Sequence, residues 1–208
     1  MVNAMMIYVE YISRRSEIEL ADFQETFKKV QEGWESSFSE DQLILNAART
    51  WRLGPQPEYL TVWCSPRAGF ARLDEWERTF RRRDCDNYGY NSPLRRVARM
   101  EYAGCYEALV VPTRARRGIY YVEGFRPVKS SAAIRSFFEE RAANHNDLTL
   151  NLLLRRLGRL APDPGGLAVW TLPKFASLAE IALEVEDIKE PVELMEAGVY
   201  VDVGEEVI

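Results

Sequence analysis

Apolar and polar positions along the chain follow two periods, one of about two residues and one of about 3.6, which alternate in a fixed order. Residues 6–12 are rich in β-branched and aromatic side chains, which predicts a strand. The helix expected next carries apolar residues at helical spacing: Phe23, Phe27, Val30 and Trp34. The pattern then predicts strands over 43–51 and 59–64, a helix marked by Phe70, Leu73, Trp76 and Phe80, and a strand over 99–110.

The same order begins again after residue 118. A strand over 119–125 is followed by a helix that starts at a Ser130–Ser131 cap and carries Ile134, Phe137 and Phe138. Strands over 148–157 and 167–171 come next, then a helix marked by Leu178, Ile181, Val185 and Ile188, then a strand over 198–203. Each half therefore has the order βαββαβ, which is typical of a ferredoxin-like unit.

The residues themselves also repeat. "PQPEYLTVWCSP" (55–66) returns as "PDPGGLAVWTLP" (162–173), and "YVEYI" (8–12) returns as "YVEGF" (121–125). "MEYAGCY" (100–106) returns as "MEAGVY" (195–200), with one residue deleted. Three matching blocks in one order indicate a duplication. We therefore expect a first repeat over 1–111, a linker over 112–117 and a second repeat over 118–208.

A single βαββαβ unit leaves one sheet face bare, and two fused copies can cover each other. In this topology the chain resembles the dimeric α+β barrel proteins. In its opening strand and aromatic helix, and in the "EYLTVW" strand followed by a helix, it is similar to their NIPSNAP-like branch. The resemblance implies an α+β fold, with two fused ferredoxin-like repeats packed sheet to sheet as a dimeric α+β barrel.

Strand alternation divides the side chains between two faces. Leu60 and Val62 share one face, and we assign this aliphatic face, with its repeat equivalents Leu167 and Val169, to the side that packs on helices. The other face should then line the barrel interior with a Tyr, a Glu and a Trp from each half: Tyr8, Glu10, Trp63, Tyr121, Glu123 and Trp170. By the same alternation Cys64 should point to the helix side as an inert thiol.

A glutamate inside a barrel needs a partner, because an unpaired buried carboxylate is costly. The candidate partners are Arg49, Arg52, Arg155, Arg156 and Arg159. Three readings stay open for Glu10 and Glu123: a structural bridge to arginine, an acid or base in a ligand pocket, or solvated side chains if the two faces are reversed. The tryptophans and tyrosines are equally compatible with a packed core.

Composition excludes several classes of partner. The 208 residues carry a net charge of −5, so no global basic field is available to hold nucleic acid. No apolar run approaches the roughly 18 residues that span a bilayer, and no secretory signal is present. The three cysteines have no CxxC spacing. We therefore expect a cytoplasmic protein with free thiols, with no nucleic-acid or membrane partner.

Motifs and metal-binding residues are scarce. The sequence has one histidine and lacks the common nucleotide-binding, hydrolase and zincin motifs, so no metal site is expected and the cofactor stays unknown. Members of the superfamily that bind heme or run acid–base chemistry often use a histidine. The resemblance therefore makes His145 a candidate ligand-binding residue, although a surface histidine at a helix end is the commoner case.

Charge is distributed unequally between the halves. The segment 78–99 has seven arginines and two aspartates, whereas 179–206 has ten acidic residues and one lysine. Opposite charge in corresponding parts of the two halves suggests pairing within the chain or between subunits, so a homo-oligomer stays open. An anionic ligand for the basic segment 78–99 is the other open reading.

Two functions are compatible with these features, and whether the protein is an enzyme is left open. The first is a small-molecule-binding protein or cofactor-independent enzyme, monooxygenase- or cyclase-like, that holds a small aromatic or apolar ligand in the barrel interior. Its acid–base groups would be Glu10 and Glu123, with Tyr8 and Tyr121 as hydrogen-bond donors and Trp63 and Trp170 as pocket walls. The alternative is a non-catalytic, NIPSNAP-like structural or protein-interaction module whose lumen is filled by its own side chains.

Overall fold

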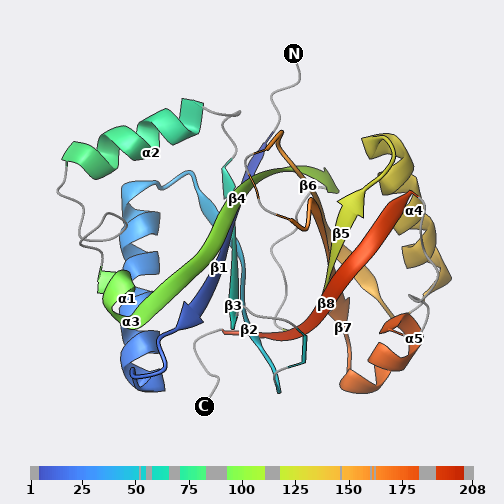
Figure 1. Cartoon of the computed structure of the whole chain (residues 1–208), viewed down its shortest axis with the longest axis horizontal. Helices are drawn as coiled ribbons and strands as arrows, with labels where there is room; N and C mark the ends of the chain where they lie inside the picture. Colours follow the sequence, from blue (N-terminus) through green and yellow to red (C-terminus); the bar gives the residue numbers. More distant parts are fainter. Residues whose placement is uncertain are drawn as a thin grey trace.

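Eight antiparallel strands close into a barrel in the computed structural model of the chain (Figure 1). The structure describes residues 5–51, 53–54, 58–65, 71–82, 93–110, 118–145, 147–159, 161, 163–182 and 191–203. The expected linker over 112–117 and residues 83–92 of the arginine-rich segment 78–99 lie outside this part of the chain.

The elements follow the predicted order. The first half contains β1 (Met6–Arg14), α1 (Leu20–Ser37), β2 (Gln42–Arg49), β3 (Tyr59–Ser65), α2 (Ala71–Arg82), α3 (Pro93–Val97) and β4 (Ala98–Val110). The second contains β5 (Ile119–Pro127), α4 (Ser131–Asn144), β6 (Thr149–Arg156), β7 (Gly166–Leu172), η1 (Phe175–Ser177), α5 (Leu178–Ala182) and β8 (Val192–Asp202). The expected Ser130 cap is confirmed, since its side chain accepts a hydrogen bond from the Ala133 backbone N–H. The short turns α3 and η1 had no sequence signal that we recognised.

The strand order is the same in both halves: β4-β1-β3-β2 in the first and β8-β5-β7-β6 in the second. Two seams close the barrel. At one, β2 pairs with β8 and Arg49 lies opposite Tyr200; at the other, β4 pairs with β6 and Tyr106 lies opposite Arg156. The helices lie outside the barrel, with α1, α2 and α3 over the first half and α4 and α5 over the second (Figure 1).

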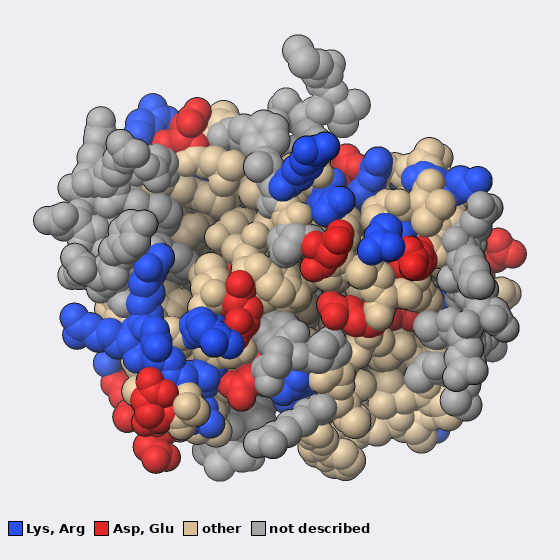
Figure 2. Space-filling view, in the orientation of Figure 1, with Lys and Arg blue, Asp and Glu red and all other residues tan. Residues whose placement is uncertain are grey.

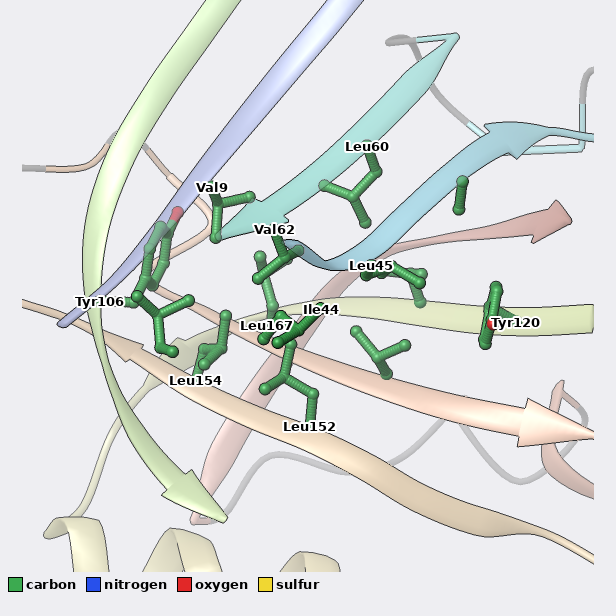
Figure 3. Close-up of a cluster of buried hydrophobic side chains, with 14 of the residues drawn as sticks. Val9, Ile44, Leu45, Leu60, Val62, Tyr106, Tyr120, Leu152, Leu154 and Leu167 are labelled. Carbon is green, nitrogen blue, oxygen red and sulfur yellow. The ribbon is translucent and has the colours of Figure 1, made fainter. Parts of the chain in front are cut away.

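The barrel interior holds one continuous apolar cluster, drawn in Figure 3. Its buried members come from all eight strands and from none of the helices, so their side chains point into the lumen. Most are aliphatic: Val9, Ile44, Leu45, Leu60, Val62, Leu152, Leu154, Leu167 and Val169 are among them. Cys64 also belongs to this cluster, so its expected place on the helix side is wrong.

The assignment of the two strand faces is therefore wrong. Leu60, Val62, Leu167 and Val169 face the lumen, whereas Trp63 and Trp170 lie under the helices. The interior of an eight-stranded barrel is just wide enough for ordinary side chains, which suits aliphatic residues. The layer between the sheet and the helices accommodates the indole rings together with the neighbouring carboxylates.

Two glycines explain the repeated "AG" of the last strand in each half. A Cβ on Gly104 of β4 would overlap Ala161 and lie 3.0 Å from the Tyr106 ring. A Cβ on Gly198 of β8 would lie 2.9 Å from the Tyr200 ring. In both strands a tyrosine two residues later packs over the glycine. The repeat therefore preserves a Gly-x-Tyr packing unit in each long strand.

Candidate functional site

The second half contains a closed ion pair between a strand and a helix. Glu123 of β5 is 1% exposed and Arg141 of α4 is 6% exposed. The Arg141 Nη1 donates to both carboxylate oxygens of Glu123, at 2.9 and 2.8 Å. The Trp170 indole N–H donates to Glu123 Oε2 at 2.7 Å, and the Arg141 guanidinium lies 5.4 Å from the Trp170 ring centre. Every charge in this cluster is compensated, which favours a structural role.

The first half repeats the carboxylate and the indole but not the arginine. Glu10 of β1 is 1% exposed, and the Trp63 indole N–H donates to its Oε2 at 3.0 Å. Among the residues that the structure describes, the second carboxyl oxygen, Oε1, has no hydrogen-bond partner. Glu10 is therefore a buried acid without the positive charge that neutralises its counterpart Glu123.

The missing arginine can be located by comparing the two helices. The inward positions of α1 are Phe23, Phe27, Val30 and Trp34, and the same spacing in α4 gives Ile134, Phe138, Arg141 and His145. Val30 thus stands where Arg141 stands in the second half, and it is buried. At this helical position the first half has an apolar residue where the second half has a cation, so Glu10 lacks the counter-charge that Glu123 has.

This difference controls the protonation of Glu10. Burial raises the pKa of Glu10 to about 7, and the hydrogen bond from Trp63 opposes the rise only in part. Because the folded-state pKa lies above the unfolded value, the folded protein binds more protons between roughly pH 4.5 and 7. Stability linked to Glu10 is therefore fully present below pH 4.5 and is lost as the pH rises through 7.

The hydrogen bond from Trp63 also determines where the proton lies. Trp63 donates to Oε2, so that oxygen must act as an acceptor and the proton of the neutral acid belongs on Oε1. The Oε1–H group then needs an acceptor, which no described residue supplies. Neutral Glu10 therefore presents an unused hydrogen-bond donor, or an acid, beneath the helices.

Aromatic rings surround this carboxyl group. The Trp34 ring lies 5.5 Å from Trp63 and 5.0 Å from Trp76, and Tyr8 meets Trp76 edge-on at 5.2 Å. Met6, Phe38 and Cys105 complete the buried cluster. Burial raises the pKa of Tyr8, and the nearby Glu10 raises it further, so Tyr8 stays protonated. The surroundings exclude water and favour a neutral, planar ligand over a charged one.

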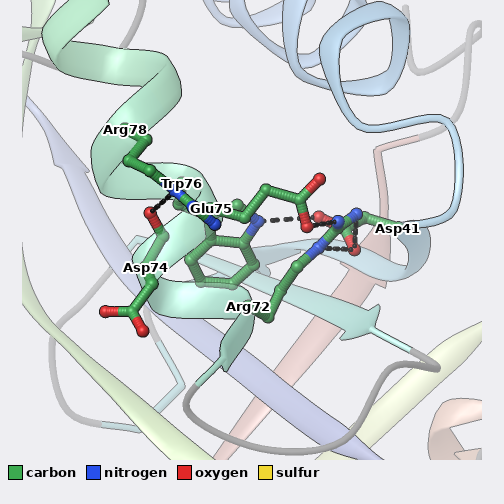
Figure 4. Close-up of polar contacts among 6 residues, drawn as sticks. All are labelled: Asp41, Arg72, Asp74, Glu75, Trp76 and Arg78. Atoms are coloured by element: carbon green, nitrogen blue, oxygen red, sulfur yellow. Dashed lines mark hydrogen bonds and ion pairs between the residues drawn. The ribbon is translucent and has the colours of Figure 1, made fainter.

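Hydrogen bonds from Asp41 to two residues of α2, Arg72 and Trp76, hold this helix against the aromatic cluster (Figure 4). Asp41 Oδ1 accepts from the Arg72 Nε and Nη2 at 3.0 and 2.8 Å, and its Oδ2 accepts from the Trp76 indole N–H at 3.0 Å. Arg72 also pairs with Glu75 and lies 5.3 Å from the Phe38 ring centre. Asp41 therefore fixes the position of Trp76, one wall of the site.

The structure brings the predicted residues together in two separate groups, both outside the lumen. Tyr8, Glu10 and Trp63 lie under α1 and α2, and the second-half residues Tyr121, Glu123 and Trp170 lie under α4. Of the five arginines expected as partners, Arg52 lies outside the described residues, and none of the other four bonds a glutamate of the site; Arg155, for example, pairs with Glu107. His145 lies at the C-terminal cap of α4, half-buried, and its role stays a prediction.

Sequence reasoning missed three residues that define the two groups: Arg141, Arg72 and Asp41. A signal existed for Arg141, because a charged residue at an inward helical position opposite a buried glutamate indicates a pair. Asp41 and Arg72 carried no such signal, since they lie in a turn and in the first turn of a helix far apart in the sequence.

Exposed arginines gather at one end of the first half, beside α3 (Figure 2). They include Arg15, Arg95, Arg96 and Arg99. Arg99 pairs with Glu101 on the same strand, at 2.7 Å. Because much of the segment 78–99 lies outside the described residues, its pairing with the acidic segment stays a prediction.

Comparison with known proteins identifies the fold. No family model and no curated protein matches the chain by sequence. A chlorite dismutase from Candidatus Nitrospira defluvii in complex with imidazole matches with a TM-score of 0.61 and 7% identity, over 96% of this chain and 92% of that chain. A heme-binding protein from Thermus thermophilus matches with a TM-score of 0.60 and 10% identity, over 96% of this chain and 91% of that chain. The chain therefore shares the fold of these chlorite dismutase-like structures, an α+β fold with an antiparallel sheet of eight strands.

Two further observations concern metals and membranes. Within the described ranges, no three His, Cys, Asp or Glu side chains gather closely enough to hold a metal ion. None of the helices described is both long and apolar enough to cross a bilayer.

Proposed function

We propose that the chain is a small-molecule-binding protein, or a cofactor-independent enzyme, that uses neutral Glu10 as its acid and hydrogen-bond donor. The observation that carries the proposal is the unpartnered Oε1 of a buried glutamate whose repeat equivalent is neutralised by arginine. Strongly perturbed acids of this kind cluster at functional sites. Trp63, Trp34 and Trp76 would contact a small aromatic ligand, and Tyr8 would donate a second hydrogen bond.

The two halves of the chain carry the same strand order. We infer that 1–111 and 118–208 are two ferredoxin-like repeats, which the shared strand order supports. The two repeats differ in how the glutamate is held: in the second, Arg141 neutralises Glu123, and in the first, the Oε1 atom of Glu10 has no partner among the described residues. The NIPSNAP-like branch, a cytoplasmic location and the oligomeric state stay predictions.

A heme does not fit the second-half site. Heme needs an axial ligand beside a large apolar pocket. The layer between α4 and its sheet is occupied by mutually contacting side chains, among them Phe125, Phe138, Trp170 and the Glu123–Arg141 pair. The layer under α4 therefore leaves no room for a heme, although one solved neighbour is a heme-binding protein.

The function requires Glu10 to be protonated when the ligand binds. A carbonyl or similar oxygen on the ligand would accept the Oε1 proton as a hydrogen bond, or take it in a proton transfer. Ligand affinity should therefore be constant below about pH 7 and fall by up to about tenfold per pH unit above it. Glu10→Gln should bind with no pH dependence, because its amide keeps a donor, but it should lose any proton transfer.

These expectations can be tested with a thermal-shift screen of planar aromatic ketones, aromatic acids and heme, followed by calorimetric titration of each hit between pH 5.5 and 8.5. Glu123→Gln is the matched control, since it changes the same residue type in the closed site. A hit whose affinity for the wild type is flat across this range, or whose pH profile is the same in Glu10→Gln, contradicts the assignment to Glu10. A screen without hits contradicts it as well.

One observation favours the non-catalytic alternative. The lumen is filled by the protein's own apolar side chains, as expected for a structural or protein-interaction module. Under that alternative, Glu10→Gln stabilises the fold at high pH and no ligand in the screen binds.

A further inference from the structure

Four polar side chains form a row beneath helix α1, beginning at Glu10. Glu10 of β1 lies opposite Thr61 of β3, and Thr61 lies opposite Asn46 of β2. Thr61 is two residues before Trp63, so it shares the helix-side face of the sheet. The Asn46 side-chain amide donates to Gln31 Oε1 of α1 at 3.3 Å, which places the outer end of the row against the helix. We call Glu10, Thr61, Asn46 and Gln31 the polar row.

Each member of the polar row has one enclosed atom without a partner. Among the described residues, these atoms are Glu10 Oε1, Thr61 Oγ1, Asn46 Oδ1 and Gln31 Nε2. Glu10 and Thr61 are 1% and 0% exposed, whereas Asn46 and Gln31 are partly buried, so the row runs from the core toward the solvent. Buried polar atoms are normally hydrogen-bonded. Four exceptions in one row therefore need a reason.

The second half has apolar residues at the same positions. Glu123 lies opposite Ala168, and Ala168 lies opposite Leu153. On the helices, Ala142 of α4 stands where Gln31 stands on α1. Packing under a helix of this fold therefore does not require polar side chains at these positions. The polar row accompanies the glutamate that has no arginine, which indicates that the row serves the proton of that glutamate.

A buried acid that gives up its proton must regain it across an apolar layer. Burial raises the pKa of Glu10 to about 7, so both protonation states occur near neutral pH. The titratable groups beside it in the aromatic cluster are Tyr8 and Cys105, and burial raises both pKa values, so both keep their own protons. The indole N–H of Trp63 only donates. The hydroxyl of Thr61 both accepts and donates, so it is the neighbour that can pass a proton on.

The two amides at the outer end complement a water molecule. The bond from Asn46 Nδ2 to Gln31 Oε1 holds the two groups side by side. It leaves Asn46 Oδ1 as an acceptor and Gln31 Nε2 as a donor. A single water molecule can bond to both atoms and also accept a proton from the Thr61 side.

We propose that the polar row is the route by which the Glu10 proton exchanges with solvent, with Thr61 as the proton-transfer residue. The Oε1–H bond of Glu10 breaks as its proton passes to Thr61 Oγ1, and the hydroxyl proton of Thr61 passes to the water at the outer end. Glu10 becomes a carboxylate, Thr61 stays a neutral hydroxyl, and the water hands its extra proton to the solvent. The reverse sequence reprotonates Glu10.

The distances allow this transfer without a change in the backbone. Cβ atoms of directly opposite residues lie about 4.5–5.5 Å apart, so side-chain rotation brings the Glu10 and Thr61 oxygens within bonding distance. The inference rests on the proposed function, in which Glu10 acts as an acid. It adds the supply of protons to that acid by a path that a ligand bound at Glu10 does not occupy.

The test measures how fast Glu10 exchanges its proton near pH 7. Carbon-13 relaxation dispersion of the side-chain carboxyl carbon gives the exchange rate, and Glu10→Gln assigns the signal. Thr61→Val removes the hydroxyl and keeps the shape, whereas Thr61→Ser keeps the hydroxyl. Asn46→Leu introduces the residue type of the second half at the outer end. Thr171→Val is the matched control, since it removes a threonine hydroxyl from β7 in the second half.

We expect proton exchange to be about tenfold slower in Thr61→Val and in Asn46→Leu, because exchange then waits for local opening of the layer under α1. Thr61→Ser and Thr171→Val should exchange at the wild-type rate. The pKa of Glu10 should change little in all four variants, since a route alters the rate of exchange and not its equilibrium. A merely structural role for Thr61 would lower the stability without slowing the exchange.

Wild-type exchange in Thr61→Val would overturn the proposal, and so would an equal loss of rate in Thr61→Ser, because the hydroxyl would then not matter. Either result leaves Glu10 a protonated acid and the proposed function intact. A Glu10 that is fully ionised at pH 7 would overturn both. Urea unfolding curves check each variant. If Thr61→Val does not fold, Asn46→Leu decides by the same criterion, and an unchanged rate there overturns the proposal.

Discussion

Arg141→Met is expected to lower the free energy of unfolding by about 3–5 kcal/mol, because it leaves Glu123 buried without its counter-charge. Arg141 makes two hydrogen bonds to the Glu123 carboxylate and a third, from Nη2, to the Ile181 carbonyl at 3.3 Å. Methionine keeps much of the apolar contact with Trp170 but none of these bonds. The loss can be measured by urea denaturation monitored by circular dichroism.

The double variant Glu123→Gln/Arg141→Met separates charge from packing. Its glutamine still accepts a hydrogen bond from Trp170 but carries no charge, so most of the lost stability should return. Val30→Met is the matched control in the first half, where no ion pair exists, and it should change stability far less. A loss below about 1 kcal/mol for Arg141→Met, or no recovery in the double variant, would show that the pair does not stabilise the fold.

Asp41→Ala is expected to cost about 3 kcal/mol and to loosen α2. The substitution removes the acceptor of three hydrogen bonds and leaves the buried Arg72 guanidinium paired with the carboxylate of Glu75, which is more exposed. Trp76 loses its indole acceptor as well, so its fluorescence should shift to longer wavelength as water reaches it. Urea denaturation and the tryptophan emission maximum measure the two effects.

Asp74→Ala is the control for this variant. Asp74 lies on α2, the helix that the network holds, is exposed, and its carboxylate points away from the network (Figure 4). Its removal should change stability by no more than about 0.5 kcal/mol. An Asp41→Ala protein that matches Asp74→Ala in both stability and emission would mean that the network does not hold α2 in place.

Much of the fold could be predicted from the sequence because both halves of the chain carry the same order of hydrophobic patterns. The spacing of Phe23, Phe27 and Val30 predicts α1, and the repeated "VW" blocks predict β3 and β7 as equivalent strands. A pattern found in two copies is far less likely to arise by chance than the same pattern found once. The element order of both halves follows directly.

The orientation of the strands could not be predicted in the same way. Alternation shows that Val62 and Trp63 lie on opposite faces, but not which face is enclosed by the barrel. Both faces are buried here, one by the opposite sheet and one by helices, so hydrophobicity does not distinguish them. Side-chain volume is no clear guide either: the lumen takes Val62 and the layer under the helices takes Trp63, but buried tyrosines also lie in the lumen.

The partner of Glu123 was missed for a related reason. A glutamate placed in the lumen has the arginines of the strands and their turns as its expected partners. With Glu123 on the helix side, the relevant position is the inward face of α4, where Arg141 stands in register with Val30 of α1. Comparing the inward positions of α1 and α4 reveals the Glu123–Arg141 pair, and it also reveals that Glu10 has no arginine at the matching position.

The central claim is that Glu10 is a buried acid that keeps its proton near neutral pH. Carbon-13 NMR of the glutamate side-chain carboxyl groups, titrated between pH 3 and 9 with Glu10→Gln to assign the signal, tests it directly. We predict an apparent pKa of about 7 for Glu10. In Val30→Arg, which restores the cation found in the second half, the pKa of Glu10 should fall well below that value. A Glu10 pKa at or below the ordinary 4.5 in the wild type would contradict the account.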